Sequence, residues 1–234
     1  MIQHFLNFKE ISFLGLDHLR DPASVLTNLL LFFVGFRCFL KISKFRSHQH
    51  PQVKVEARGW SLFFLFGSIA YLFGVPVHGF SWYIPEQIHF YIWLLMGWTQ
   101  IFAATFAQFA TAKWYFPKQF GWIRILIVLQ FLFFCWMMVY IRKFAAVNVD
   151  VALALVPIAF WNIYLFNKKK IVTARIGWGI LFAAIAAIFV VLKVMISDWF
   201  SYNDIAHIFL VGSLLMVYSG LMKHFRSLSA LPVR

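Results

Sequence analysis

Seven continuous apolar stretches, each about as long as a bilayer-spanning helix, occupy most of this 234-residue chain. Hydrophobic residues make up 62% of the sequence and charged residues only 12%, which is more apolar surface than a soluble domain of this length could cover. A lipid bilayer can solvate such a surface. We therefore expect an integral membrane protein whose function resides in the few polar residues near membrane depth.

The stretches predict an all-α fold rather than a β-barrel, because none shows the alternation of polar and apolar residues that a barrel wall requires. Seven spans leave little of the chain for anything else, so we expect residues 1–234 to form a single seven-helix membrane domain. The expected spans cover about residues 22–43, 58–80, 86–112, 120–141, 149–167, 174–196 and 203–223.

Basic residues are divided unequally between the two sides of this arrangement. Sixteen of the 21 Lys and Arg residues fall on the side that holds the connections 1–2, 3–4 and 5–6 and the C-terminal tail, whereas seven of the eight acidic residues fall on the other. The positive-inside rule then predicts an outside N-terminus and a cytoplasmic C-terminus. The run Lys168–Lys170 is interpreted as an anchor at anionic lipid heads, and the net charge of +13 does not indicate a nucleic-acid partner.

This topology carries polar side chains from distant parts of the sequence to the outer ends of three helices. They are His78 at the end of the second span, Glu86 and His89 at the start of the third, and Asn203, Asp204 and His207 at the start of the seventh. In a helix, residues three or four positions apart share a face, so Asn203 and Asp204 neighbour His207. We expect one polar pocket near the outer face.

Imidazoles and carboxylates that converge in this way are typical of a zinc or other transition-metal site. The candidate ligands are His78 and His207, with His89 or Asp204 completing the set. A metal-bound water can act as a hydrolytic nucleophile, with Glu86 or Asp204 as the catalytic base that orients it. Structural roles stay open for the same residues, since histidines also join helices by hydrogen bonds and carboxylates also stabilise helix N-termini.

The segments FGVPVHGF (73–80) and YNDIAHIFLVGSLLMVYSG (202–220), within a seven-helix plan, resemble the CREST-type membrane-hydrolase superfamily of alkaline ceramidases and adiponectin-type receptors. The segment DPASVLTNLL (21–30) is similar to the entry to the first span in divergent bacterial relatives. The resemblance implies a lipid hydrolase that holds Zn²⁺ with histidines of the second and seventh helices. It also implies a bacterial inner (plasma) membrane location.

Position by position, the resemblance makes His78 and His207 zinc ligands. The second histidine position on the seventh helix is occupied by Asn203, and the serine position four residues before His78 is occupied by Gly74. No aspartate follows early in the third helix, where Glu86 and His89 stand instead. The motif is therefore incomplete at two of its positions.

Two functions follow, and the sequence leaves open whether the protein is an enzyme. One is a metal-dependent hydrolase of a lipid amide or ester at the outer leaflet. The other is a non-catalytic lipid-binding protein or accessory subunit of a larger membrane complex, with membrane lipids and other membrane-protein subunits as partners. A transporter is less favoured, because the spans carry few charges and show no inverted repeat.

Overall fold

The computed structural model describes residues 21–169, 173–196 and 200–230, and in these ranges it contains helices and no strand. The helices are α1 (Pro22–Ser43), α2 (Pro51–Gly79), α3 (Glu86–Tyr115), α4 (Phe120–Ile141), α5 (Ala145–Lys169), α6 (Ala174–Leu192) and α7 (Tyr202–Ser229). All seven are long and apolar enough to cross a membrane. The predicted all-α class and helix number are confirmed, while residues 1–20 of the predicted domain lie outside the described ranges.

Several helices extend beyond the apolar stretches that predicted them. α2 begins at Pro51 rather than near residue 58, because proline at the first helical position has a suitable φ and lacks only an N–H that would be unpaired anyway. α7 continues to Ser229 rather than ending near residue 223. α6, by contrast, ends at Leu192 because Lys193 adopts the left-handed conformation, with φ of 50°. Apolarity marks the part of a helix suited to lipid, and polar turns can continue it.

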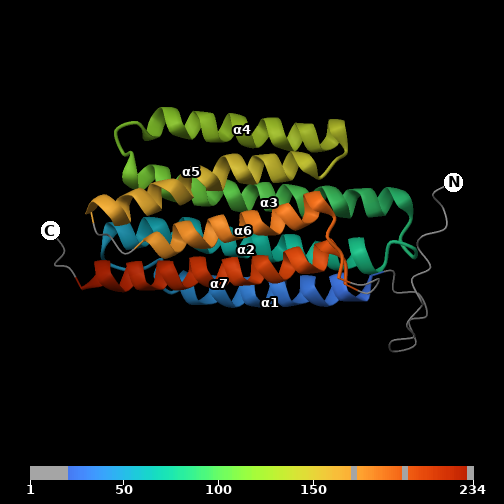
Figure 1. The fold of residues 1–234 in the computed structure, drawn as a ribbon. Helices are drawn as coiled ribbons and strands as arrows, with labels where there is room; N and C mark the ends of the chain where they lie inside the picture. The colour runs from blue at the N-terminus through green and yellow to red at the C-terminus, as the bar shows by residue number, and fades with distance from the viewer. Residues whose placement is uncertain (1–20, 170–172, 197–199, 231–234) are drawn as a thin grey trace.

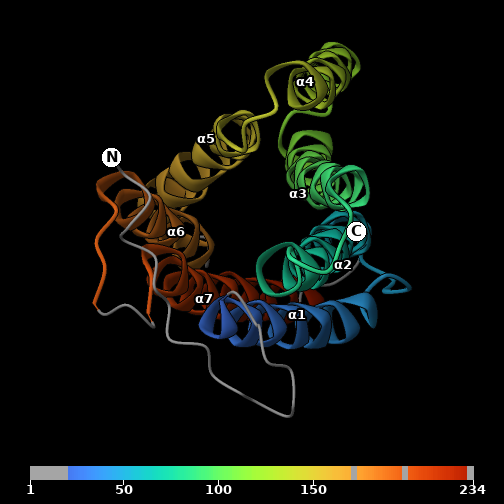
Figure 2. The same cartoon turned by 90° about the vertical axis from the view of Figure 1, so that its right-hand side faces the viewer.

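Six helices form a ring, in the order α1, α2, α3, α5, α6 and α7, with α7 packing back against α1. α4 lies outside the ring against α3 and α5 (Figure 2). The helices run side by side along a common axis (Figure 1). α1, α3, α5 and α7 begin at one end of the bundle, which we call the Asp204 end, and finish at the other, which we call the His224 end.

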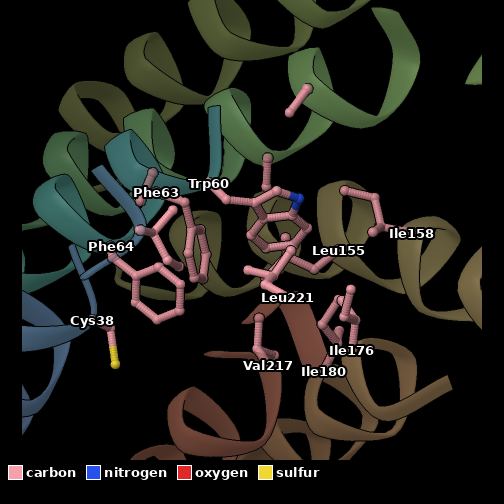
Figure 3. Packing of buried hydrophobic residues seen from close by; sticks show 14 of the residues in the cluster. Cys38, Trp60, Phe63, Phe64, Leu155, Ile158, Ile176, Ile180, Val217 and Leu221 are labelled. Atoms are coloured by element: carbon pink, nitrogen blue, oxygen red, sulfur yellow. The ribbon is translucent and has the colours of Figure 1, made fainter. Parts of the chain in front are cut away.

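Apolar side chains fill the interior of the ring (Figure 3). Trp60, Phe63 and Phe64 of α2 pack in one cluster with Val217 and Leu221 of α7. The same cluster includes Leu155 and Ile158 of α5 and Ile176 and Ile180 of α6. The polar groups that remain gather near the two ends of the ring and along α3, α4 and α5.

Small residues allow the closest helix contacts, as expected where burial in lipid adds little driving force and packing must supply it. A Cβ at Gly59 of α2 would overlap the methyl group of Ala110 and the carbonyl oxygen of Phe106, both on α3. At Gly67, about two turns further along α2, no neighbouring atom lies within 4 Å of the same added atom.

We expect Gly59→Ala to destabilise the bundle by about 1–3 kcal/mol, because the added methyl group forces α2 and α3 apart. Gly67→Ala is the matched control, and its higher helix propensity should leave stability unchanged or raise it by up to about 1 kcal/mol. Thermal unfolding of the detergent-purified protein, followed by tryptophan fluorescence, measures both. Equal unfolding temperatures for the two variants would contradict the close contact.

Candidate polar site at the Asp204 end

The first turn of α1 presents three polar side chains on one face. Asp21 is the N-cap of α1, and its side chain accepts a hydrogen bond from the backbone N–H of Ser24 at 3.0 Å, with Pro22 in the first turn. Ser24, Thr27 and Asn28 follow at spacings of three and four residues, so they share the face of α1 that turns toward α2 and α7.

Asp204 of α7 is fully buried and joins the starts of α1 and α7. Its Oδ2 accepts hydrogen bonds from the backbone N–H of Ser201 at 2.7 Å and from the Ser201 hydroxyl at 2.8 Å. Its Oδ1 accepts from the hydroxyl of Ser24 at 2.8 Å and lies 3.3 Å from the hydroxyl of Thr27. Both carboxylate oxygens are therefore engaged in capping α7 and holding it to α1.

His207 lies one turn further along α7, with its Nδ1 atom 2.8 Å from the hydroxyl oxygen of Thr27. The same hydroxyl has three oxygen acceptors within reach: the carbonyl of Ala23 at 2.9 Å, and the carbonyl of Ser24 and Oδ1 of Asp204, each at 3.3 Å. If its single proton goes to one of these, the hydroxyl accepts a hydrogen bond from Nδ1–H of His207. We assign this tautomer from the network, and it leaves Nε2 with a free lone pair.

His78 of α2 completes the group. Its ring centroid lies 6.4 Å from that of His207, with the two rings nearly perpendicular at 79°. Tyr71, on the same helix, makes a similar edge contact with His207 at 6.5 Å. Both imidazoles are half-buried. The structure thus brings together two histidines that are far apart in the sequence.

The remaining candidate residues lie differently. His89 donates from Nε2 to the carbonyl oxygen of Val77 at 3.2 Å, so it satisfies one of the free carbonyls at the end of α2. Glu86 is an exposed residue in the first turn of α3, where a carboxylate suits the positive end of the helix dipole. Asn203 is half-buried, and no hydrogen bond among the described residues joins it to His78 or His207.

Gly74 stands where the resemblance implies a serine, and the structure shows what replaces that side chain. A Cβ at Gly74 would overlap the amide group of Asn28 from α1, whose Nδ2 donates to the carbonyl of Ser24 at 2.8 Å. The polar group one turn before His78 therefore comes from another helix. In the structure the amide of Asn28 takes the place of a side chain at position 74. In the sequence these are two separate residues, a glycine on α2 and an asparagine on α1.

The zinc ion implied by the resemblance needs at least three protein ligands. Among the described residues only two imidazoles lie together at this end, and both oxygens of Asp204 already accept hydrogen bonds. Within the described ranges, no group of three His, Cys, Asp or Glu side chains is placed to hold one metal ion. The described donors at this end do not fit the three-histidine centre that the resemblance implies.

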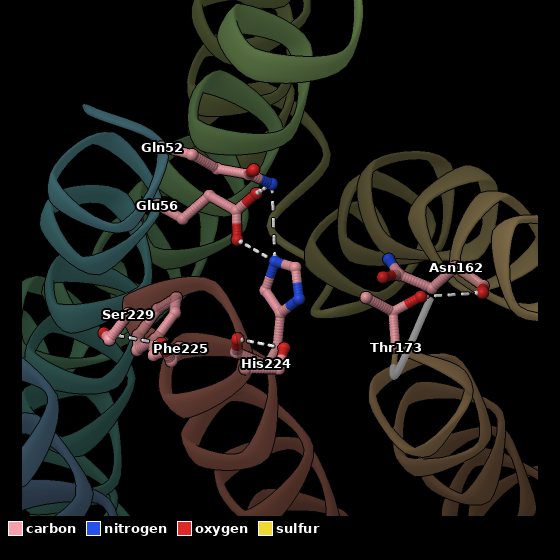
Figure 4. Close-up of polar contacts among 8 residues, drawn as sticks. Gln52, Glu56, Asn162, Thr173, His224, Phe225 and Ser229 are labelled. Carbon is pink, nitrogen blue, oxygen red and sulfur yellow. Dashed lines mark hydrogen bonds and ion pairs between the residues drawn. The ribbon is translucent and has the colours of Figure 1, made fainter. Parts of the chain in front are cut away.

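Two further polar clusters emerge only in the structure. At the His224 end, Nε2 of His224 lies 3.0 Å from Oε2 of Glu56, and Gln52 donates to Oε1 of Glu56 at 2.9 Å (Figure 4). The side chains of this ion pair are only 1% and 4% exposed. One feature of the sequence could have indicated this cluster: Glu56 is the single acidic residue assigned to the side that is rich in Lys and Arg.

The second cluster crosses α3, α4 and α5. Gln130 donates to Oδ1 of Asp150 at 2.8 Å and accepts from Gln108 at 3.3 Å. The two glutamines thus join α3, α4 and α5 through side-chain hydrogen bonds. Their partner Asp150 was not foreseen, because in the sequence it stood out only as one of the seven acidic residues on the side opposite the basic connections.

A model of a family described as of unknown function (DUF6962) matches residues 23–224. No curated protein and no solved structure matches the chain. The match extends from the first turn of α1 into the last turns of α7, so it includes both the His78–His207 pair and the Glu56–His224 pair.

Proposed function

We propose that this chain, which belongs to the DUF6962 family, is a non-catalytic integral membrane protein that binds a lipid between α1, α2 and α7. The single observation that carries the proposal is the short contact between Thr27 and His207, which leaves Nε2 of His207 as a hydrogen-bond acceptor beside His78. The polar groups nearby are already occupied in joining helices. What this site offers a ligand is Nε2 of His207, in largely apolar surroundings beside the ring of His78.

The charge distribution supports an orientation for this site. The basic connections lie at the His224 end, so the positive-inside rule puts that end in the cytoplasm and the Asp204 end outside. We propose that the imidazole pair lies in the outer leaflet of a plasma membrane, at the level of lipid head groups and linkages. The resemblance to bacterial relatives supports a bacterial inner membrane.

The acceptor character of Nε2 narrows the class of lipid. A free lone pair on an imidazole binds a hydroxyl or an amide N–H, whereas a simple ester has no proton to donate. We therefore propose a lipid that carries an amide or a hydroxyl near its acyl chains. As an accessory subunit, the protein would present this lipid to a larger membrane complex.

Binding of a long-chain N-acyl amino alcohol, added to nanodiscs of phosphatidylcholine, tests the proposal. His207→Phe should weaken binding about fivefold to tenfold, since a buried neutral hydrogen bond contributes about 1 kcal/mol and an unpaired donor costs more. His89→Phe is the matched control at the same end, and it should retain the affinity. Equal affinities for the wild type and His207→Phe would refute the site.

A metal-dependent lipid hydrolase is the second candidate, and the paired rings of His78 and His207 favour it. Their spacing and the Thr27 contact to Nδ1 match the way in which ligating histidines are oriented by a hydrogen bond on the other ring nitrogen. Stoichiometric zinc in the purified protein, with fatty-acid release abolished by His78→Ala, would select this candidate. Lipid binding without zinc or release would select the first.

A further inference from the structure

Arg46, in the connection between α1 and α2, is held in a fixed orientation near the His224 end. Its Nε–H donates to the hydroxyl oxygen of Ser61 at 2.7 Å. That hydroxyl in turn donates to the carbonyl of Arg58 at 2.9 Å, so Ser61 presents its lone pairs to the arginine. The guanidinium carbon also lies 5.4 Å from the ring centroid of Phe39, within the range of a cation–π contact.

One side of this guanidinium lacks a partner. Nη2 of Arg46 is buried, and no acceptor within the described part of the chain reaches it. Burial of a charged donor without an acceptor is costly. Glu56, the acidic residue on the same side of the bundle, is paired instead with Gln52 and His224.

The positive charge of Arg58 adds to the cost of burying the charged side chain of Arg46. Burial lowers the pKa of Arg46 from its ordinary value, and the nearby positive charge of Arg58 lowers it further. Both effects act against the charged form of the side chain, and the attraction of an anion next to the two arginines would offset them. Guanidinium groups pair with phosphate through two parallel hydrogen bonds, and the contacts with Ser61 and Phe39 already fix the plane of this one. A phosphate reaches its buried Nη2 once the side chains that cover this atom move aside.

We propose that Arg46 and Arg58 bind the phosphate group of an anionic phospholipid at the His224 end of α1. A lipid is favoured over a soluble phosphate because the guanidinium lies over the ring of Phe39, next to Leu40 in the sequence of α1, and Leu40 is exposed. Leu40 is 47% exposed and Phe33, about two turns away on the same face of α1, is 63% exposed, so acyl chains can lie along this helix from the head group. This site is at the opposite end from the imidazole pair and does not depend on the proposed function.

Titration of phosphatidylglycerol into phosphatidylcholine nanodiscs that hold the full-length protein tests the assignment, with binding read by native mass spectrometry. Arg46→Gln should weaken phosphatidylglycerol binding about fivefold or more, from the usual contribution of one basic residue at a lipid surface. Arg46→Lys should recover only part of this loss, because it keeps the charge but not the planar fork. Ser61→Ala, which releases the guanidinium without removing charge, should also weaken binding.

Arg124→Gln is the matched control, because Arg124 is an exposed arginine at the same end, on α4. Equal losses in Arg46→Gln and Arg124→Gln would show a non-specific charge effect and overturn the site. Inorganic phosphate forms a separate arm. If millimolar phosphate displaces phosphatidylglycerol from the wild type as well as unlabelled lipid does, the lipid is not the source of the phosphate. Arg58→Gln repeats the test should Arg46→Gln not fold.

Discussion

Replacing Asp204 by alanine is expected to reduce the free energy of unfolding by about 3 kcal/mol or more. The carboxylate accepts from the backbone N–H and hydroxyl of Ser201 and from the hydroxyl of Ser24, all within 2.8 Å. Hydrogen bonds to a charged group contribute about 1.5–3 kcal/mol each, and an alanine leaves buried donors without acceptors. The loss should exceed that of an ordinary N-cap, which is about 1 kcal/mol.

Asp204→Asn should lie between the wild type and Asp204→Ala, because the amide keeps one oxygen acceptor but turns an N–H₂ group toward other donors. Glu86→Ala is the matched control, since Glu86 is an acidic residue of a helix first turn at the same end but is exposed. It should change stability by less than about 0.5 kcal/mol. Thermal unfolding in detergent measures all three. An Asp204→Ala protein as stable as Glu86→Ala would contradict the capping arrangement.

The second large effect is expected at Glu56 and His224. Either Glu56→Leu or His224→Leu should cost about 3–5 kcal/mol, because each leaves its buried partner uncompensated. The double variant Glu56→Leu/His224→Leu should be more stable than the worse of the two single variants, since two apolar side chains of similar volume leave no orphan charge. The pair is buried to 1% and 4% exposure, so solvent can replace neither partner.

A double-mutant cycle on unfolding free energies measures the coupling between the two residues. Gln52→Leu is the reference variant, because Gln52 donates to Glu56 at 2.9 Å but carries no charge. Its loss of unfolding free energy should be smaller than that of either Glu56→Leu or His224→Leu. If the losses of unfolding free energy in the two single variants simply add in the double variant, Glu56 and His224 do not form a coupled pair. This result would contradict a stabilising role for the cluster at the His224 end.

The helical plan was predictable because its signals are local. A run of about 20 apolar residues predicts a span wherever it occurs, and Asp21 followed by Pro22 predicts a helix start. The errors fell where helices continue in polar residues. α2 starts at Pro51, which is in a polar segment that hydropathy assigns to a loop. Composition shows where lipid can solvate a helix but not where its hydrogen bonding ends.

The candidate site was predictable in part for the same reason. Opposite directions of α2 and α7 place the end of one beside the start of the other, which was enough to expect His78 and His207 at one end. The burial of Asp150 was missed because its hydrogen-bond partner Gln130 lies on another helix. No spacing within α5 carries that information.

By itself, the sequence determined the class, number and approximate course of the helices, and the division of charge between the two ends. The tertiary structure alone decided which polar atoms meet: Thr27 with His207, Asn28 in the space beside Gly74, and Glu56 with His224. Those contacts depend on how each helix is rotated about its own axis and shifted along its neighbours. Rotation and shift are set by the packing of all the side chains together, so they cannot be read from any one segment.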